Sequence, residues 1–195
     1  MANFYINGQS TTDAVFGLCD NQPPAKTPAY IDSTTREIWI AEINNTNGIN
    51  IDFYAIDNNV VLYRPDRSFA KRCDGMLKYQ SKIHFIELKD RGSKCVRKGR
   101  RQIEETIEHF AINHPDEQSL LSDCYICNKQ LFEEIAFDDI LEFKNRTANM
   151  SDCYICNKQL FEEIAFDDIL EFKNRTANIL KSNGLTLNIN RIIVI

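Results

Sequence analysis

The sequence contains no long run of apolar residues. No stretch approaches the roughly 18 apolar residues that a membrane-spanning helix requires, and the first residues, MANFYINGQSTTDAVFG, include neither a basic segment nor a long apolar one. Secretory signal peptides have both of these features. We therefore expect a protein that stays inside the cell, in the cytoplasm, and has no membrane partner.

Histidine, tryptophan, proline and glycine are scarce, with 3, 1, 5 and 7 residues in a chain of 195. Hydrophobic residues make up 43% and charged residues 26%, which is ordinary for a globular protein and excludes the disordered, collagen-like and coiled-coil classes. The length is that of one domain of common size. We expect a single domain over residues 1–195.

Charge is unevenly distributed along the chain. The net charge of −5 argues against a polyanionic partner, but it is a sum over the whole chain and hides local differences. Residues 64–101 contain thirteen Lys or Arg and four Asp or Glu, a net +9, so the rest of the chain carries −14. Local cations, and the counterions they displace, provide affinity for nucleic acid. The segment therefore indicates a surface that faces phosphates, with a solvated basic helix face as the alternative.

The C-terminal part contains an identical repeat. Residues 122–149, SDCYICNKQLFEEIAFDDILEFKNRTAN, recur without change at residues 151–178, an offset of 29 residues. Two copies are too few for a solenoid, and each copy predicts a short strand, CYIC, followed by an amphipathic helix. Because both copies favour the same position, we expect one of them to be displaced, to extend a sheet edge, or to form a swapped homodimer.

The repeat also places four cysteines in a zinc-like pattern of two CxxC pairs. The second pair is a copy of the first, and residues i and i+3 of a strand point to opposite faces. Buried thiols are therefore the favoured interpretation, and a zinc-stabilised interaction module is an alternative. With an odd total of seven cysteines, we expect no disulfides. The four cysteines of the pattern are Cys124, Cys127, Cys153 and Cys156.

The first 112 residues predict a short helix, then strands, then a second helix. A capping pattern at residues 10–13 predicts a helix over residues 11–19. Residues 96–110 predict a basic amphipathic helix, and residues 82–90, apolar on both faces, predict a central strand. Apolar segments separated by turn sequences predict an antiparallel meander. Its strands are expected within residues 37–43, 49–56, 60–65, 73–79 and 82–90.

Two carboxylates and an amine are expected to share one site. Glu87 and Lys89 lie two residues apart near the end of the central strand, so both side chains leave the same face. A hairpin can bring Asp74, at the start of the preceding strand, beside Glu87. Two neighbouring carboxylates repel unless a cation or a proton lies between them, and their hard oxygens favour Mg²⁺. Such an ion polarises a phosphodiester and activates a bound water, while an ammonium offsets charge in the transition state.

Asp74, the Glu87-x-Lys89 motif at a strand end and a following basic helix with Gln102 resemble the PD-(D/E)xK superfamily of restriction-endonuclease-like nucleases. The resemblance covers about residues 50–130. It implies an α/β (α+β) fold with a central mixed sheet, an antiparallel meander and flanking helices. The nuclease-like core would occupy about residues 37–149, with the duplicated strand-helix unit at the C-terminus.

The resemblance also implies roles for individual residues. Asp74 and Glu87 would bind Mg²⁺ or Mn²⁺, Lys89 would be the catalytic amine, and Gln102 would support the site. Cys73 stands where the family has a proline. A literal Pro65-Asp66 makes Asp66 the second choice of metal ligand, and Asp57 is the third.

These features predict a metal-dependent nuclease that hydrolyses phosphodiester bonds in nucleic acid, with DNA favoured. One alternative is a nuclease-fold protein that binds nucleic acid or a protein without cleaving, and the other is the zinc module. The three histidines, His84, His109 and His114, are assigned no catalytic role. The cations expected to bind nucleic acid follow the Glu-x-Lys motif, and they are Arg91, Lys94, Arg97, Lys98, Arg100 and Arg101.

Overall fold

The computed structural model describes residues 2–21, 24–89, 95–129, 152–157, 188–189 and 192–194. These residues form two β-sheets and one α-helix, α1 (Cys95–Asn113), together with the short 3-10 helices η1 (Arg36–Ile38) and η2 (Pro115–Leu120). The strands are β1 (Gln9–Thr11), β2 (Val15–Cys19), β3 (Tyr30–Asp32), β4 (Ala41–Asn44), β5 (Ile51–Ala55), β6 (Gly75–Tyr79), β7 (Lys82–Lys89), β8 (Leu121–Asn128), β9 (Asp152–Asn157), β10 (Asn188–Ile189) and β11 (Ile192–Val194).

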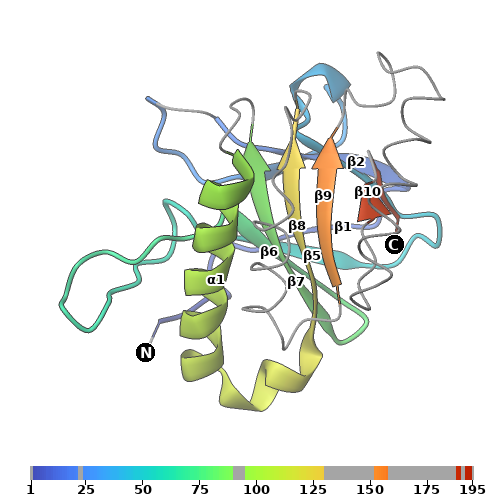
Figure 1. Cartoon of the computed structure of the whole chain (residues 1–195). Coiled ribbons are helices and arrows are strands. Elements are labelled where there is room, and N and C mark those ends of the chain that lie inside the picture. The colour runs from blue at the N-terminus through green and yellow to red at the C-terminus, as the bar shows by residue number, and fades with distance from the viewer. Residues whose placement is uncertain are drawn as a thin grey trace, which may run out of the picture.

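The larger sheet is mixed and has the strand order β1-β5-β6-β7-β8-β9-β10. The pairs from β1 to β7 are antiparallel, and those from β7 to β10 are parallel. Helix α1 makes the crossover that a parallel pair requires between β7 and β8 (Figure 1). The expected meander is therefore present in β5, β6 and β7, and β7 is central with apolar residues on both faces.

Each face of this sheet has its own hydrophobic core. On one face, Met76 and Phe85 of the strands pack with Ile103 and Phe110 of α1. On the other face, apolar strand residues such as Leu77 pack against a second sheet of order β11-β4-β2-β3. The expectation of flanking helices is therefore wrong for this second face: in the described parts of the chain, a sheet covers it. The architecture is mixed α and β with few helices.

The N-terminal region differs most from the sequence-based prediction. Residues 11–19, expected to be helical, contain strand β2, which pairs with both β3 and β4. Phe16 and Leu18 of β2 are completely buried in the inter-sheet core, so tertiary packing overrides the local capping pattern. Strand β4 belongs to this second sheet instead of the meander. Residues 60–65 form no regular strand, and Tyr63 makes only an isolated bridge to Phe69.

The two copies of the repeated strand lie side by side. Strands β8 and β9 pair in parallel, so that each residue lies beside its own duplicate, from Asp123 opposite Asp152 to Asn128 opposite Asn157. The second copy thus extends the sheet beyond β8, and β10 adds to it in turn. The helices expected in both copies fall outside the described residues. Among the described residues, none of the helices combines the length and the apolar composition of a membrane-spanning segment.

Candidate active site

Asp74, which directly precedes β6, and Glu87 of β7 face the same side of the sheet. Strands β6 and β7 pair with Gly75 opposite Ile86, so the next positions along the register are Asp74 and Glu87. Alternation places both side chains on the face that carries Met76, which is the face covered by α1. The structure therefore brings together the two carboxylates that the sequence predicts to be neighbours.

Hydrogen bonds and an ion pair fix the three predicted groups. The Oδ2 atom of Asp74 accepts a hydrogen bond of 2.5 Å from the backbone N–H of Leu88, which lies between the other two residues. The Lys89 ammonium forms an ion pair with Oε1 of Glu87. The Lys89 side chain retains 21% of its exposure, whereas Glu87 has none, so the amine marks the open side of the site.

Burial changes the protonation of both acids. Desolvation raises the pKa of Asp74 from 3.8 to about 7, against the opposing effects of Lys89 and of the Leu88 hydrogen bond. Desolvation, followed by the nearby charge of Asp74, raises the pKa of Glu87 well above its ordinary value. For Lys89, desolvation acts to lower the pKa, but the two carboxylates outweigh it and the net shift is upward. The site therefore holds protons or a cation more strongly than exposed carboxylates would.

Helix α1 holds the backbone that leads to Asp74. The Gln102 side chain donates a hydrogen bond of 2.8 Å to the carbonyl oxygen of Arg72, and Thr106 Oγ1 accepts one of 2.9 Å from the backbone N–H of Cys73. Both contacts are to the two residues that precede Asp74. Gln102, predicted to support the site, thus contacts the peptide chain of this segment.

Two further acids contribute to the electrostatics of the site. Asp57, the third choice of ligand, lies in the turn after β5, pairs with Arg72 at 3.0 Å and acts to raise the pKa of both Asp74 and Glu87. Asp20 follows β2 and also acts on Asp74. Burial raises the pKa of Asp20 itself, and Lys89 opposes that shift. Asp57 was already the third choice of ligand from the sequence, but no local signal identifies Asp20, which follows a strand of the other sheet.

Asp66, the second choice of metal ligand, lies away from this group. Its Oδ1 atom accepts hydrogen bonds from the backbone N–H and the hydroxyl of Ser68, at 2.9 and 2.6 Å. These bonds are the first causes of its lowered pKa. The Asp66 side chain therefore stabilises the turn in which it lies, a common role for aspartate in loops.

The donor set of Asp74 and Glu87 fits a hard divalent cation. Oε2 of Glu87 is fully buried and has no hydrogen-bond partner in the described part of the chain. Mg²⁺ is commonly held by one or two carboxylates, with water and substrate phosphate completing its shell. Over the described ranges, no group of three or more His, Cys, Asp and Glu residues is arranged to hold a metal ion. The protein would thus supply two acidic ligands and leave the remaining positions to other oxygens.

The predicted nucleic-acid-binding cations have different positions. Lys98 and Arg101 of α1 are exposed, as a phosphate-binding surface requires. Arg100 is only 3% exposed and pairs with Glu104 at 3.5 Å, so its guanidinium lies inside the molecule. Arg91 and Lys94 fall outside the described residues, as does the side chain of Arg97.

The cysteines of the first repeat are buried on opposite faces of the sheet. Cys124 belongs to the core beneath α1 and Cys127 to the core between the sheets, as residues i and i+3 of a strand should. One tetrahedral ion cannot bind both thiols across the sheet. Neither thiol forms a disulfide with another cysteine of the described residues, and both are buried, as are Cys19 and Cys73.

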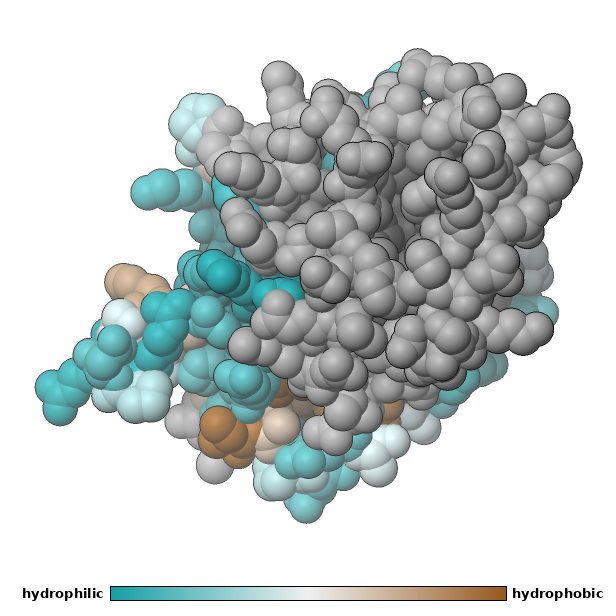
Figure 2. Space-filling view, viewed as in Figure 1, coloured by the Kyte–Doolittle hydropathy of each residue, from teal (hydrophilic) through white to brown (hydrophobic). Residues whose placement is uncertain are grey.

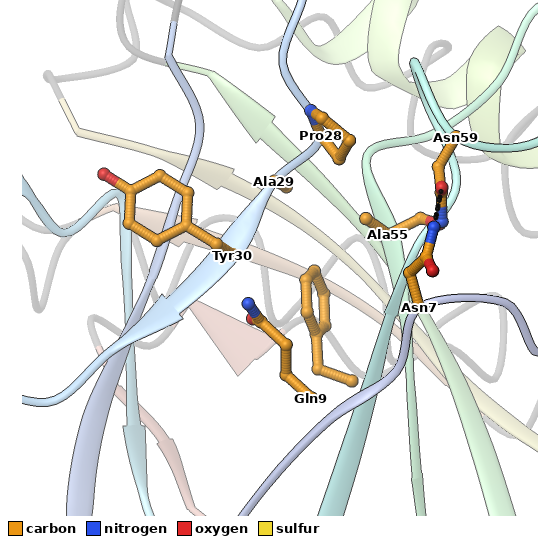
Figure 3. Close-up of a pocket in the computed structure, with 8 residues that line it drawn as sticks. Asn7, Gln9, Pro28, Ala29, Tyr30, Ala55 and Asn59 are labelled. Carbon is orange, nitrogen blue, oxygen red and sulfur yellow. Dashed lines mark hydrogen bonds between the residues drawn. The ribbon is translucent and has the colours of Figure 1, made fainter.

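A separate pocket of about 240 Å³ opens near β5 (Figure 3). Asn7 and Asn59 join by a hydrogen bond of 2.9 Å on one side of it, and Tyr30 lies on the other. Its described lining contains no carboxylate. The pocket therefore offers amide and aromatic contacts but none of the acid groups found at Asp74 and Glu87.

Comparison with known proteins does not assign the site to a family. The chain matches no protein-family model, and neither the curated proteins nor the solved structures give a match.

Proposed function

We propose that this protein is a Mg²⁺- or Mn²⁺-dependent nuclease that hydrolyses phosphodiester bonds in nucleic acid, with DNA the favoured substrate. The observation that carries the proposal is the placement of two buried carboxylates, Asp74 and Glu87, on one face of adjacent strands with the ammonium of Lys89 beside them. The resemblance of this trio to the PD-(D/E)xK pattern supports the same function.

Each side chain has a distinct task in this proposal. Asp74 and Glu87 would hold the metal ion, which supplies positive charge to polarise the phosphodiester and to lower the pKa of a coordinated water. Both acids must lose their protons to bind it, and the partly exposed Lys89 would offset negative charge on the phosphate in the transition state. Gln102 would act indirectly, as a positioning residue, through the backbone that carries Asp74.

Cleavage of labelled DNA and RNA with and without Mg²⁺ tests this function. We expect Glu87→Gln and Lys89→Met to abolish metal-dependent cleavage while circular dichroism and thermal melting show a folded protein. Glu108→Gln and Lys82→Met are matched controls, because both residues are exposed and lie on α1 and β7, the elements that carry or cover the site. Equal cleavage by the site variants and the wild type would reject the proposal.

A second candidate is a protein that binds nucleic acid without cleaving it. The specific observation in its favour is the ion pair between Lys89 and Glu87, in which the ammonium already neutralises one of the two acids. Salt-sensitive binding that is the same in Mg²⁺ and in EDTA, together with absence of cleavage, would select this candidate.

A further inference from the structure

Residues 61–71, between β5 and β6, form a hairpin-like arm. Tyr63 and Phe69 face each other as an antiparallel bridge, and the backbone N–H of Ala70 donates to the carbonyl of Leu62 at 2.9 Å. A further backbone bond of 2.9 Å joins Arg64 to Ser68 at the tip. The arm projects from the body of the molecule beside α1, as the teal loop at the left of Figure 1.

The two faces of the arm have opposite environments. Leu62 and Ala70 point inward and are buried in the core beneath α1. The alternate positions point outward, and there Tyr63 is 56% and Phe69 64% exposed. This face is unusual because the outward positions of a surface hairpin normally carry polar residues. In the space-filling view, the projecting arm is mostly hydrophilic with an apolar patch on it (Figure 2).

The two exposed rings form a preformed aromatic platform. Tyr63 and Phe69 stack with their centroids 5.3 Å apart and their planes 27° from parallel. Large exposed apolar groups on a monomeric surface commonly mark a site of interaction. Two stacked rings offer a flat outer surface that suits another flat, conjugated group.

Contacts to α1 hold the arm in place. The Arg64 guanidinium forms a bidentate pair with Glu105, with a shortest distance of 2.7 Å, and the same carboxylate accepts the backbone N–H of Lys71 at 2.8 Å. Both sides of the arm, Arg64 near its tip and Lys71 at its end, are thus attached to one residue of the helix. Such preorganisation lowers the entropy lost when a ligand binds.

The charge of the arm selects the kind of partner. It carries three cations, Arg64, Arg67 and Lys71, against the single acid Asp66, for a net +2. Arg67 is exposed at the tip, and Lys71 lies on the outward side with the rings. Stacking rings next to cations are the combination by which proteins bind unpaired nucleic-acid strands, with bases on the rings and phosphates on the cations.

We propose that the arm binds unpaired bases of a nucleic-acid strand, with the Tyr63 and Phe69 pair stacking on the bases and Arg67 and Lys71 contacting the phosphates. This inference rests on the proposed function for the class of ligand and adds to it a preference for single-stranded segments. The arm continues through Arg72 and Cys73 into Asp74, so two residues join it to one of the two acids.

Fluorescence anisotropy with short labelled oligonucleotides in EDTA tests the arm without cleavage. We expect Tyr63→Ala and Phe69→Ala each to weaken binding of single strands about tenfold, the range found when one stacking ring is removed. Tyr63→Phe and Phe69→Tyr should retain wild-type affinity, since both keep a ring. Val61→Ala, on the same exposed face, and Ile112→Ala, an exposed residue of α1, are the matched controls.

An abasic oligonucleotide separates stacking from charge. Wild type and the two alanine variants should bind it equally, whereas Arg67→Ala should weaken binding to every oligonucleotide and reduce the salt dependence. Unchanged single-strand affinity in both alanine variants would overturn the inference, and so would an equal loss on the abasic strand. Concentration-dependent self-association that disappears in Tyr63→Ala would overturn it in favour of contact between two copies of the chain.

The same variants distinguish failure of this inference from failure of the proposed function. Metal-dependent cleavage by the wild type, with ring variants that bind normally, would reject the arm and keep the nuclease. Ring-dependent binding in EDTA without any cleavage in Mg²⁺ would keep the arm and reject the nuclease.

Discussion

Gly99 of α1 lies directly against Glu87: a Cβ atom added at Gly99 would be 3.0 Å from Cγ of Glu87 and 3.3 Å from Cγ2 of Ile126. Glycine in a helix interior costs about 1 kcal/mol relative to alanine, so local helix stability does not explain the residue. Its small size allows α1 to approach β7 and β8 closely enough to cover Glu87 and exclude water from one side of the site.

We therefore expect Gly99→Val to destabilise the protein by about 1–3 kcal/mol, the usual cost of inserting atoms into a packed core. Denaturant unfolding measures this free energy. Glu108→Val, at an exposed position of the same helix, is the control and should cost only the loss of helix propensity, about half a kcal/mol. Equal effects of the two valines would show that the close approach of Gly99 to Glu87 has no energetic importance.

Stability should fall as the pH rises through neutrality in the absence of metal. The pKa of Asp74 is about 7 in the folded protein against 3.8 ordinarily, so folding binds a proton to this group. Its contribution is fully present below pH 3.8 and is lost as the pH rises through about 7. Glu87, whose pKa is also raised, acts in the same direction.

Thermal melting from pH 5 to pH 9 in EDTA checks this dependence on Asp74. The melting temperature of the wild type should decrease by several degrees over this interval, and Asp74→Asn should show a flatter profile because it cannot ionise. Mg²⁺ should stabilise the wild type more at high pH than at low pH, since it competes with protons for the same oxygens. A melting temperature that rises with pH would contradict the burial of these acids.

Lys89 and Glu87 should be strongly coupled. Lys89→Met leaves a buried carboxylate next to Asp74 without its cation, a change that typically costs about 3–5 kcal/mol. The loss should be smaller at low pH, where Glu87 takes up a proton in place of the ammonium. Glu87→Gln combined with Lys89→Met should recover part of the stability, and a double-mutant cycle by denaturant unfolding measures the coupling. Additive effects of the two substitutions would show that the ion pair is unimportant.

Thr106 is a positioning residue for Asp74. Its hydroxyl accepts the buried N–H of Cys73 and donates to the carbonyl of Gln102 at 2.7 Å, so Thr106→Val leaves a buried donor without a partner. We expect a loss of about 1–3 kcal/mol and a shift of the pH at which stability declines, because the carboxylate moves with its backbone. Thr106→Ser, which keeps the hydroxyl, should retain both the stability and the pH dependence of the wild type. A valine variant that is less stable but has an unchanged pH profile would indicate a role in stability alone.

The sequence predicted the relative positions of Asp74, Glu87 and Lys89 better than it predicted the surrounding fold. Glu87 and Lys89 lie on β7, and Asp74 directly precedes β6. The period-2 pattern and the short hairpin between these strands are local properties, so the shared face of the three residues can be predicted from the sequence. The prediction of a helix over residues 11–19 was wrong because β2 gains its stability from β3, β4 and the inter-sheet core. Those partners are distant in sequence and leave no local signal.

The same distinction explains the arm and Asp20. The exposure of Tyr63 and Phe69 depends on how Leu62 and Ala70 enter the core, which period-2 alternation alone does not decide. Asp20 acts on Asp74 only because the second sheet lies over the first. A count of charges located the basic segment, but it could not show that Arg100 is turned inward to Glu104.

Deleting one copy of the repeat should leave the fold intact. Removal of residues 150–178 and removal of residues 122–150 produce the same chain, of 195 − 29 = 166 residues. The remaining strand keeps the positions of β8 that form both cores, such as Cys124 in the core beneath α1 and Cys127 in the core between the sheets. Strand β10, which now pairs with Tyr154 and Ile155, would meet the identical pair Tyr125 and Ile126 on β8.

In the shortened chain, the edge of β8 that β9 now covers would therefore present the same residues to β10 as β9 does in the full chain. We expect the shortened chain to unfold in one cooperative transition, with a melting temperature within a few degrees of that of the full chain. Circular dichroism, thermal melting and the oligomeric state by light scattering check this outcome. A shortened chain that aggregates, or that melts without a cooperative transition, would show that the second strand is required to protect the edge of β8.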